Sequence, residues 1–462
     1  MKLEVIEMNN HRAWDNGRLI VSDNGRHLQH ADGTPFFWLG DTAWLILKRT
    51  TREQALTYLR DRKNKGYNVI QIMLVHDLNS ANAYGRVPFR DLDLDQPDAE
   101  HTESFTSYWS YADEVIDMAE REGLYVALVP VWGSVVEYYS PNAETAERYG
   151  EWVGNRYKDR PNVIWLNGGD IRGSDHRDAW LHMGRAIRKA APNHLMTFHP
   201  YGRTQSSTWF HNEDWLDFNM FQSGHRSYEQ MDEANPDTLV GEDNWRFVQK
   251  DWSEVPAKPT IDGEPSYEDI PHGLHNLEAP RWTTDDVRRY AYWAVFAGAF
   301  GHTYGHNAVM QFHSEERGVG AYGCTRSWIE ALDDDGAKQM VHLKHLFLSR
   351  PYDERTPDDT TICGDQGYRY DRLFVSLGKS YLMAYTYTGR SITLQLGLFS
   401  GKQAAVWWFN PRTGESESAG VVDNEGAQEF VPQAVSAPGN DWVLVLDDVD
   451  QGYAAPGLPL SR

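Results

Sequence analysis

The chain of 462 residues has only two cysteines, Cys324 and Cys363. Two cysteines are too few for a disulfide framework, and their spacing lacks the CxxC pattern of metal and redox sites. We therefore expect two free thiols. A chain of this length can bury a large hydrophobic core, and it exceeds the size of one average domain, so we expect two domains.

Positive charge is also scarce, with 44 Lys and Arg residues against 67 Asp and Glu residues, a formal net charge of -23. Phosphate backbones are bound by clustered Lys and Arg, so this balance argues against a nucleic-acid partner. It argues more weakly against free pectic acids, because a local group of arginines can still bind one carboxylate.

Long hydrophobic runs are missing as well. No segment approaches the ~18 consecutive apolar residues of a membrane span. The first residues, MKLEVIEMNNHRAW, lack the apolar core of a signal peptide. We expect a soluble cytoplasmic protein with no membrane partner and an unknown oligomeric state. An exported protein whose signal has been removed would have the same sequence.

Several catalytic motifs are absent. No GxGxxG follows a predicted strand, and GxxxxGK[ST], HExxH and GxSxG do not occur. Nucleotide cofactors, zinc proteases and serine hydrolases therefore have no support. We expect no cofactor and no metal.

Aromatic residues are abundant, with 18 Trp and 24 Tyr. Their flat rings can stack on sugars, although packing in a core is the commoner use.

Residues 162–170 (NVIWLNGGD) carry the clearest local signal. An unbroken apolar run is typical of a strand buried on both faces of a parallel sheet. The two glycines that follow allow a sharp bend, which leaves Asp170 room to face a cleft. Taken alone, Asp170 could equally cap the next helix. A second stretch of the same design, PTIDGEP (259–265), ends on Asp262, Gly263 and Glu264, so two strand ends supply carboxylates.

The chain from Phe36 repeats a unit of amphipathic helix and short apolar strand. Predicted strands begin at Phe36 and cover residues 69–75, 125–131, 162–166, 195–199, 217–221, 260–263 and 300–304. Predicted helices cover residues 51–65, 105–122, 143–157, 178–190, 285–297 and 328–348, with Thr51 as the N-cap of the first. Eight strands in about 270 residues predict an α/β fold of the (β/α)8 TIM-barrel type. A Rossmann-type sheet is the alternative.

The pattern changes after Pro351. Short apolar segments at residues 373–377, 381–387, 392–396, 405–409 and 442–446 are separated by Gly, Asn, Asp and Pro. This pattern predicts a β-sandwich. We therefore divide the chain into a catalytic barrel with a short lead-in, residues 1–350, and a sandwich domain, residues 351–462.

In a (β/α)8 barrel every strand ends on the same face, so residues that follow the strands converge there. The candidates to line one pocket are Asp41, Trp44, His76, Trp132, Asn167, Asp170, His199, Gln222, Glu264, His302 and His306. Glycoside hydrolysis requires two carboxyl groups, and the fourth and seventh strands face each other across the ring. We predict that Asp170 is the general acid and Glu264 the nucleophile or base, although the reverse assignment remains open.

Each accessory residue has an alternative. Asp41 and Trp44 are equally suited to packing. His302 and His306 could bind a metal, but two histidines beside glycines more often donate hydrogen bonds. Asp262 is expected to support Glu264 or its loop.

With these residues in hand, the chain resembles the apiosidase-like glycoside hydrolases of family 140. The matching stretches are WLGDTAW (38–44), RPNVIWLNGGD (160–170), HPYGRTQSSTW (199–209), IDGEPSYE (261–268) and GHTYGHNAVMQF (301–312). The C-terminal part, with VWWFNPRTGE (406–415), is similar to the β-domain that follows this barrel in the family and carries a collagen-binding label. Nothing in its residues indicates collagen recognition.

The resemblance implies a (β/α)8 barrel, catalytic Asp and Glu at the positions of Asp170 and Glu264, and hydrolysis of a link to apiose, a branched plant pentofuranose. We therefore predict a glycoside hydrolase that cleaves a terminal furanoside, first of all an apioside, in a small glycoside or plant oligosaccharide. One alternative is another pentoside such as an arabinofuranoside. Another is a carbohydrate-binding protein without catalysis.

Overall fold

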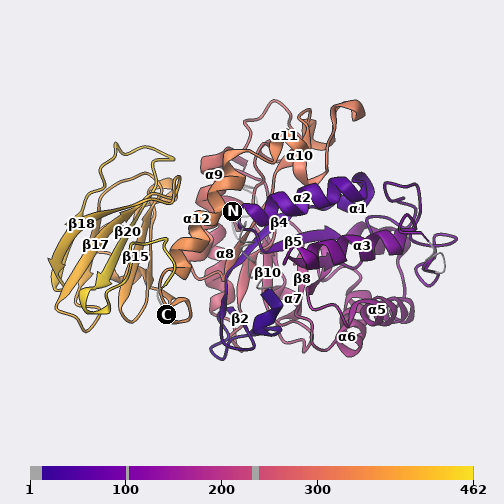
Figure 1. Ribbon diagram of the computed structural model, residues 1–462, viewed down its shortest axis with the longest axis horizontal. Coiled ribbons are helices and arrows are strands. Elements are labelled where there is room, and N and C mark those ends of the chain that lie inside the picture. The colour runs from indigo at the N-terminus through magenta and orange to yellow at the C-terminus, as the bar shows by residue number, and fades with distance from the viewer. Residues whose placement is uncertain (1–12, 100–103, 231–238, 461–462) are drawn as a thin grey trace, which may run out of the picture.

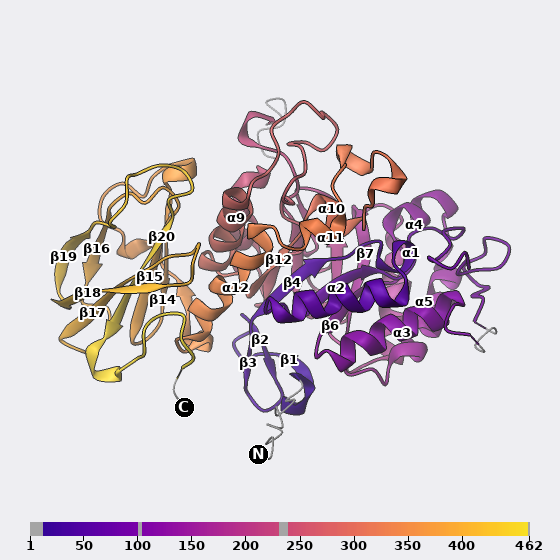
Figure 2. The same cartoon turned by 45° about the horizontal axis from the view of Figure 1, so that its top comes forward.

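The computed structural model (Figure 1) describes residues 13–99, 104–230 and 239–460. The lead-in forms a small antiparallel sheet of β1 (Leu19–Val21), β2 (Leu28–His30) and β3 (Pro35–Phe36). The expected lead-in residues 1–12 lie outside the described residues. A large α/β body follows and then a C-terminal β-body, which lie beside each other in Figures 1 and 2. None of the described helices is both long and apolar enough to cross a lipid bilayer.

The centre of the large body is a curled parallel sheet of six strands. In spatial order these are β12 (Gly301–Tyr304), β4 (Trp38–Thr42), β5 (Val69–Met73), β6 (Tyr125–Val129), β7 (Val163–Ile171) and β8 (Met196–Pro200). The residues of these strands are buried. This agrees with the sequence, in which continuous apolar runs predicted strands covered on both faces. The exception is Asp170, near the end of β7, which is exposed.

The two other predicted strands belong to a second sheet, in the order β11 (Thr260–Asp262), β10 (Asn219–Gln222) and β9 (Thr204–Gln205). β10 and β11 run parallel. Backbone hydrogen bonds link this sheet to both edges of the first, since Asp217 N–H donates to Met196 O over 2.8 Å and Phe300 N–H donates to Thr260 O over 3.0 Å. All eight predicted strands are therefore present. Six of them form the first sheet, and the other two, β10 and β11, pair with each other in the second sheet.

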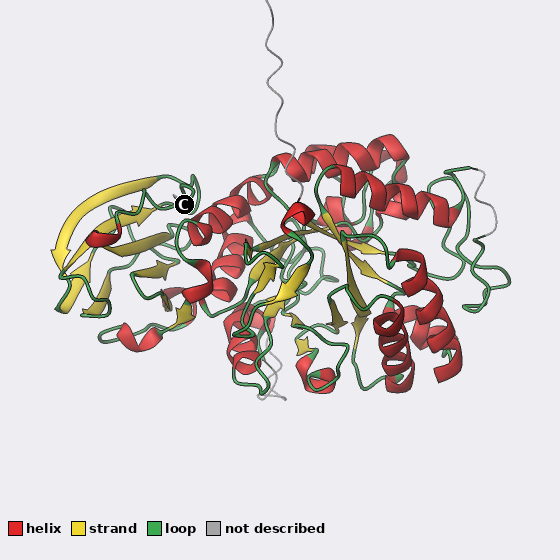
Figure 3. Ribbon diagram, turned by 60° about the horizontal axis from the view of Figure 1, so that its bottom comes forward, coloured by secondary structure: helices red, strands yellow, loops and turns green. Residues whose placement is uncertain are grey.

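Helices lie around the outside of these strands (Figure 3). They are α1 (Ile46–Arg49), α2 (Arg52–Asn64), α3 (Tyr108–Arg121), α4 (Gly133–Tyr139), α5 (Ala143–Tyr157), α6 (Arg177–Ala190), α7 (Ser207–Phe210), α8 (Asn244–Trp252), α9 (Thr284–Phe296) and α10 (Asn307–Met310). The predicted N-cap of α2 is confirmed, because the Thr51 hydroxyl accepts from Gln54 N–H and the Gln54 side chain accepts from Thr51 N–H. The helices that the sequence did not predict are α1, α4, α7, α8 and α10.

The helix predicted over residues 328–348 is two helices, α11 (Trp328–Ala331) and α12 (Asp335–Leu348). Asp334 lies at the break with an extended backbone, φ -65° and ψ 150°. Its carboxylate pairs with His306 and Arg326. A side chain that is tied to two loops in this way fixes the chain outside the helical conformation.

The C-terminal body is a β-sandwich, which confirms the predicted fold class for this part. One sheet has the order β13 (Thr356–Pro357), β14 (Leu373–Leu377), β15 (Tyr381–Thr386), β20 (Trp442–Asp448), β17 (Gln403–Phe409) and β18 (Ser416–Asp423), and the second pairs β16 (Ile392–Leu396) with β19 (Gly426–Phe430). The five predicted strands are all present. β18 escaped prediction because its residues are mostly exposed and polar.

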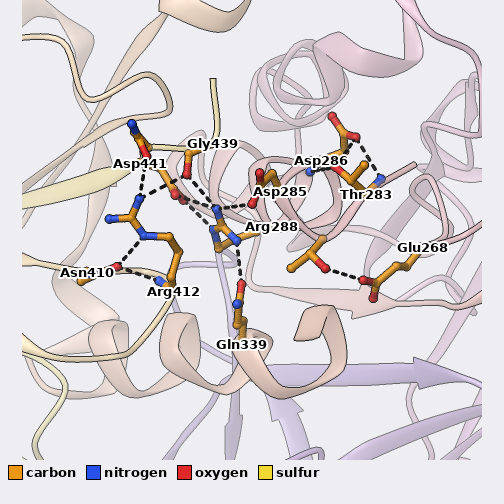
Figure 4. A network of polar contacts seen from close by, with 12 residues as sticks. Glu268, Thr283, Asp285, Asp286, Arg288, Gln339, Asn410, Arg412, Gly439 and Asp441 are labelled. Atoms are coloured by element: carbon orange, nitrogen blue, oxygen red, sulfur yellow. Dashed lines mark hydrogen bonds and ion pairs between the residues drawn. The ribbon is translucent and has the colours of Figure 1, made fainter. Parts of the chain in front are cut away.

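The two bodies share one hydrophobic cluster, in which α9 and α12 of the large body pack against β14, β15, β17 and β20. Figures 1 and 2 both place α9 and α12 at this contact. Figure 4 shows the polar part of the contact, where Arg288 meets the carboxylate of Asp441 over 2.8 Å. Both side chains are completely buried. The interface thus resembles the inside of a domain more than a hinge.

Candidate active site

A pocket of about 690 Å³ opens where the parallel strands end. Its lining comes from the residues that close or follow the strands of both sheets. They include Trp44, His76, Trp132, Asp170, Tyr201, Gln222, His225, Glu264, Tyr267 and Met310. The carboxyl ends of the strands therefore converge on one cavity, where a (β/α)8 enzyme has its active site.

Asp170 reaches this pocket because β7 bends at its end. The backbone takes positive φ angles at Gly168 (93°), Gly169 (123°) and Asp170 itself (51°). A Cβ atom on Gly169 would lie 2.7 Å from the Trp132 ring, which excludes any larger residue without movement. The two glycines therefore do what their place in the sequence indicated, and the bend turns Asp170 into the pocket instead of onto a helix.

The surroundings of Asp170 favour its protonated form. Solvent reaches the carboxyl group through the pocket, but protein atoms enclose it on its other sides. Burial and the negative charge of Glu264 raise the pKa of Asp170 to about 7, although hydrogen bonds from Gln222 and the Gly202 backbone favour the charged form. The backbone N–H of Asp170 donates to Nδ1 of His199 over 3.3 Å.

Glu264 lies between two imidazole rings. Nε2 of His225 is 3.2 Å from Oε1 of Glu264, and Nε2 of His199 is 3.3 Å from Oε2. Burial by itself raises the pKa of Glu264, but the hydrogen bonds and charge of His199 and His225 outweigh it and lower the pKa to about 2. Glu264 is therefore held as a carboxylate.

The backbone fixes which imidazole nitrogens carry protons. Nδ1 of His199 accepts from Asp170 N–H, and Nδ1 of His225 accepts from Tyr267 N–H over 3.4 Å. An accepting Nδ1 is unprotonated, so the hydrogen of each neutral ring sits on Nε2, facing Glu264. The Nε2 atoms of both rings therefore face the Glu264 carboxylate.

Two carboxyl groups in one pocket therefore have pKa values that are pushed in opposite directions, one to about 7 and one to about 2. Such a pair can supply an acid and a base, or an acid and a nucleophile, at the same pH.

Four of the other predicted residues also line the pocket, namely Trp44, His76, Trp132 and Gln222. Trp44 donates through Nε1 to the Tyr267 hydroxyl over 3.1 Å and packs against the Trp132 ring, with 5.2 Å between ring centroids. His199 stands behind this layer, fully buried. The aromatic rings form a firm wall next to the two carboxyl groups.

Asp41 and Asn167 do not line the pocket, which corrects their expected place. Asp41 is fully buried behind β4, where its Oδ2 accepts from Arg62 over 2.5 Å and from Tyr58 over 2.6 Å. Asn167 is buried too and donates to Trp180 O over 2.9 Å. Successive strand residues face opposite sides of the sheet, and these two side chains contact the surrounding helices.

His302 and His306 are likewise away from the pocket lining. His302 is buried within β12, and burial lowers its pKa to about 3. His306 caps α10 by accepting from Ala308 N–H, and its Nε2 lies 2.9 Å from Asp334. Both side chains are buried, and within the described residues no three His, Cys, Asp or Glu side chains are grouped to hold a metal ion.

His225 is the main residue that sequence reasoning missed. It lies three residues beyond Gln222, in the loop after β10. This position after a strand was the available signal, because the same rule identified Gln222. Tyr267, in the loop after β11, and Met310, at the end of α10, line the pocket and lie within the motifs at 261–268 and 301–312, so those motifs also pointed to them.

Matches to known proteins cover most of the chain. Residues 22–354 match a family model described as "Apiosidase-like, catalytic domain", and residues 356–447 match "Putative collagen-binding domain of a collagenase". A solved structure titled "Glycoside hydrolase" is 46% identical, with a TM-score of 0.92 over 95% of this chain and 99% of that chain. A glycoside hydrolase family 5 structure from Bacteroides vulgatus ATCC 8482 is 42% identical, with a TM-score of 0.93 over 98% of each chain.

No curated protein matches the chain. The first family match spans most of the chain, and both solved relatives share more than 40% of its residues over nearly its whole length. This chain therefore belongs to the apiosidase-like glycoside hydrolases and is a glycoside hydrolase.

Proposed function

We propose that the enzyme cleaves a terminal furanoside, an apioside of plant origin, with Asp170 as general acid and Glu264 as nucleophile or base. The observation that carries the assignment of roles is the opposed environment of the two carboxyl groups. Asp170 has a pKa raised to about 7, whereas Glu264 has a pKa lowered to about 2 and two imidazole neighbours. An acid must keep its proton until the leaving group departs, and a nucleophile or base must be ionised.

In this mechanism Asp170 gives its proton to the glycosidic oxygen as the bond from that oxygen to the anomeric carbon breaks. Glu264 either attacks the anomeric carbon or removes a proton from a water molecule that attacks it. In the first case a water molecule then hydrolyses the glycosyl-enzyme, with Asp170 acting as base. The His199 and His225 N–H groups hold the Glu264 carboxylate in place during either course.

The sugar is assigned from the family and the cavity. The family model is described as apiosidase-like. A cavity of about 690 Å³ is of the size that encloses a small glycoside, and the rings of Trp44, Trp132 and Tyr267 offer apolar faces beside the acids. Another pentoside, such as an arabinofuranoside, fits the same description and is the second candidate. The alternative of a binding protein without catalysis is set aside, since the chain is a member of a hydrolase family.

We also propose that the eight strands together form one (β/α)8 barrel, with residues 1–350 as the catalytic domain and 351–462 as the sandwich domain. The backbone hydrogen bonds from Asp217 to Met196 and from Phe300 to Thr260 support closure of the ring at both edges of the six-stranded sheet.

A panel of 4-nitrophenyl glycosides tests the sugar. We expect kcat/KM on the β-D-apiofuranoside to exceed that on the α-L-arabinofuranoside and the β-D-xylopyranoside by about tenfold or more, the discrimination that a fitted pocket gives between similar sugars. Glu264→Gln protein, purified in parallel, controls for contaminating enzymes. Preference for the arabinofuranoside would replace apiose with the second candidate.

A further inference from the structure

The loop that carries His225 leaves β10 at Gln222 and ends in a short 3-10 helix at Gly241–Asp243. Gly224, His225 and Arg226 line the pocket, and His225 lies 3.2 Å from Glu264. The described part of the loop continues through Tyr228, which is buried, to Gln230. What holds Tyr228 therefore also limits where His225 can lie, three residues earlier.

Glu242 holds Tyr228 from the far end of the loop. Its Oε1 accepts from Tyr228 N–H over 2.7 Å. Its Oε2 accepts from Arg289 over 2.7 Å and from the Tyr370 hydroxyl over 3.0 Å. Glu242 is 1% exposed, so these partners replace the water that its charge would otherwise need.

Tyr370 belongs to the C-terminal part of the chain, within the match to the collagen-binding model. Its ring packs edge-on against the ring of Tyr228, with 5.6 Å between centroids. The neighbouring Arg369 lies 4.5 Å from the Tyr228 ring centroid. The C-terminal body thus touches Tyr228 directly and also through Glu242.

Arg289 completes this contact from α9. It is fully buried, and its guanidinium lies between 4.8 and 5.4 Å from the ring centroids of Tyr370 and Tyr387. Tyr290 and Trp293 enclose it from its own helix at about the same distances. The same guanidinium also lies 3.4 Å from the Asp286 carboxylate. The four aromatic rings make a rigid, desolvated setting for the Glu242 ion pair.

From these contacts we propose that the C-terminal domain has a catalytic task, in which Tyr370 acts as a positioning residue that holds Glu242 and Tyr228 and so keeps His225 against Glu264. The proposal rests on the proposed role of Glu264. It gives the C-terminal domain a function within the enzyme that requires no collagen or other polymer as a partner.

Two tyrosine variants separate positioning from general stability. Tyr370→Phe removes the hydroxyl that donates to Glu242 and keeps the ring. Tyr381→Phe is the matched control, because the Tyr381 hydroxyl also makes a hydrogen bond in the C-terminal body, donating to Pro351 O over 2.9 Å, and that bond does not involve the loop. Both variants retain the apolar packing of the interface.

We expect Tyr370→Phe to lower kcat by about tenfold on the best substrate of the glycoside panel, with KM within about twofold, since a small displacement of a catalytic group costs rate more than binding. Tyr381→Phe should keep kcat within about twofold. Hydrogen–deuterium exchange of peptides covering residues 223–230 should become faster in Tyr370→Phe alone. This readout does not depend on the identity of the sugar or on the role of Glu264.

The outcomes are distinct. Faster exchange in the loop together with a lower kcat, both confined to Tyr370→Phe, supports the proposal. Unchanged exchange, faster exchange with unchanged kcat, or equal effects in both variants would overturn it. An active Glu264→Gln enzyme would instead refute the proposed function, and the exchange result would still show whether Tyr370 holds the loop.

Discussion

The two carboxyl groups at the centre of the site show how similar groups acquire different pKa values. Asp170 is partly desolvated and faces another negative charge, so its proton is retained. Glu264 is buried more deeply but receives two imidazole N–H groups, so its charge is retained. Burial alone would have raised both pKa values, and the two histidines make the difference.

The pH dependence of kcat/KM follows from these two pKa values. In the proposed mechanism catalysis needs protonated Asp170, so we expect kcat/KM to fall tenfold per pH unit above about pH 7. The same mechanism needs ionised Glu264, and its pKa of about 2 lies far below that range, so kcat/KM should stay level from about pH 4 to 6.

Initial rates in buffers of constant ionic strength measure this profile. Asp170→Asn, with no group to titrate, should lose the alkaline limb while circular dichroism shows that it is folded. An alkaline limb that persists in Asp170→Asn would assign the titration to another group.

The sequence correctly predicted which side chains reach the pocket when the residue lies at the end of a strand. It failed for residues inside a strand, where the pleat decides which face of the sheet the side chain is on. Asp170 lies at the bent end of β7 and Glu264 lies just after β11, each next to a glycine, and both reach the pocket. Asp41 and Asn167 lie within strands, where a shift of one residue sends a side chain to the other face. His225 was missed because the loop after β10 has no repeating pattern.

At the scale of elements, the apolar runs, caps and turn residues predicted most helices and all eight strands, because these signals are local. The division of 328–348 into α11 and α12 could not be predicted, since it depends on the distant partners His306 and Arg326 of Asp334. The division of the strands into two sheets likewise depends on tertiary pairing.

Asp41 links β4 to α2 through Arg62, and both side chains are fully buried. Asp41→Asn leaves the Arg62 charge without its main partner, so we expect the free energy of unfolding to fall by about 3 kcal/mol. Because Asp41 does not touch the pocket, kcat and KM of the folded variant should change by less than about twofold.

Urea unfolding followed by circular dichroism measures the first quantity, and initial rates measure the others. Asp333→Asn serves as the control, since Asp333 is 74% exposed in its pair with Lys65 and should change stability by about 1 kcal/mol at most. A large rise in KM with unchanged stability would instead indicate that Asp41 contacts the substrate.

The whole molecule is held together by a buried interface. Arg288 of α9 makes two hydrogen bonds of 2.8 Å to the Asp441 carboxylate. Arg350, which follows α12, pairs with Asp447 of β20. Figure 4 shows Gln339 and Asp285 on the other side of Arg288. With the shared apolar cluster around α9 and α12, these contacts predict that the two bodies unfold together.

We expect differential scanning calorimetry to show one cooperative transition for the wild-type chain. Asp441→Asn removes the buried charged partner of Arg288 and leaves only the half-exposed Asp285, so stability should fall by about 3 to 5 kcal/mol while the transition stays single. Asp285→Asn is the control, because Asp285 is 51% exposed and should have an effect below about 1 kcal/mol. Two separate transitions, with only one moved by Asp441→Asn, would show that the bodies are independent.

The dependence of activity on the leaving group tests the paired carboxyl groups most directly. On a methyl glycoside of the preferred sugar, Asp170→Asn should lose about 10²- to 10⁴-fold in kcat/KM, the usual contribution of a general acid. On the 2,4-dinitrophenyl glycoside, whose leaving group needs no proton, the same variant should lose less than about tenfold. Glu264→Gln should lose activity on both substrates by on the order of 10⁴-fold. Full activity of either variant on the methyl glycoside, or an equal loss for Asp170→Asn on both substrates, would contradict the assignment.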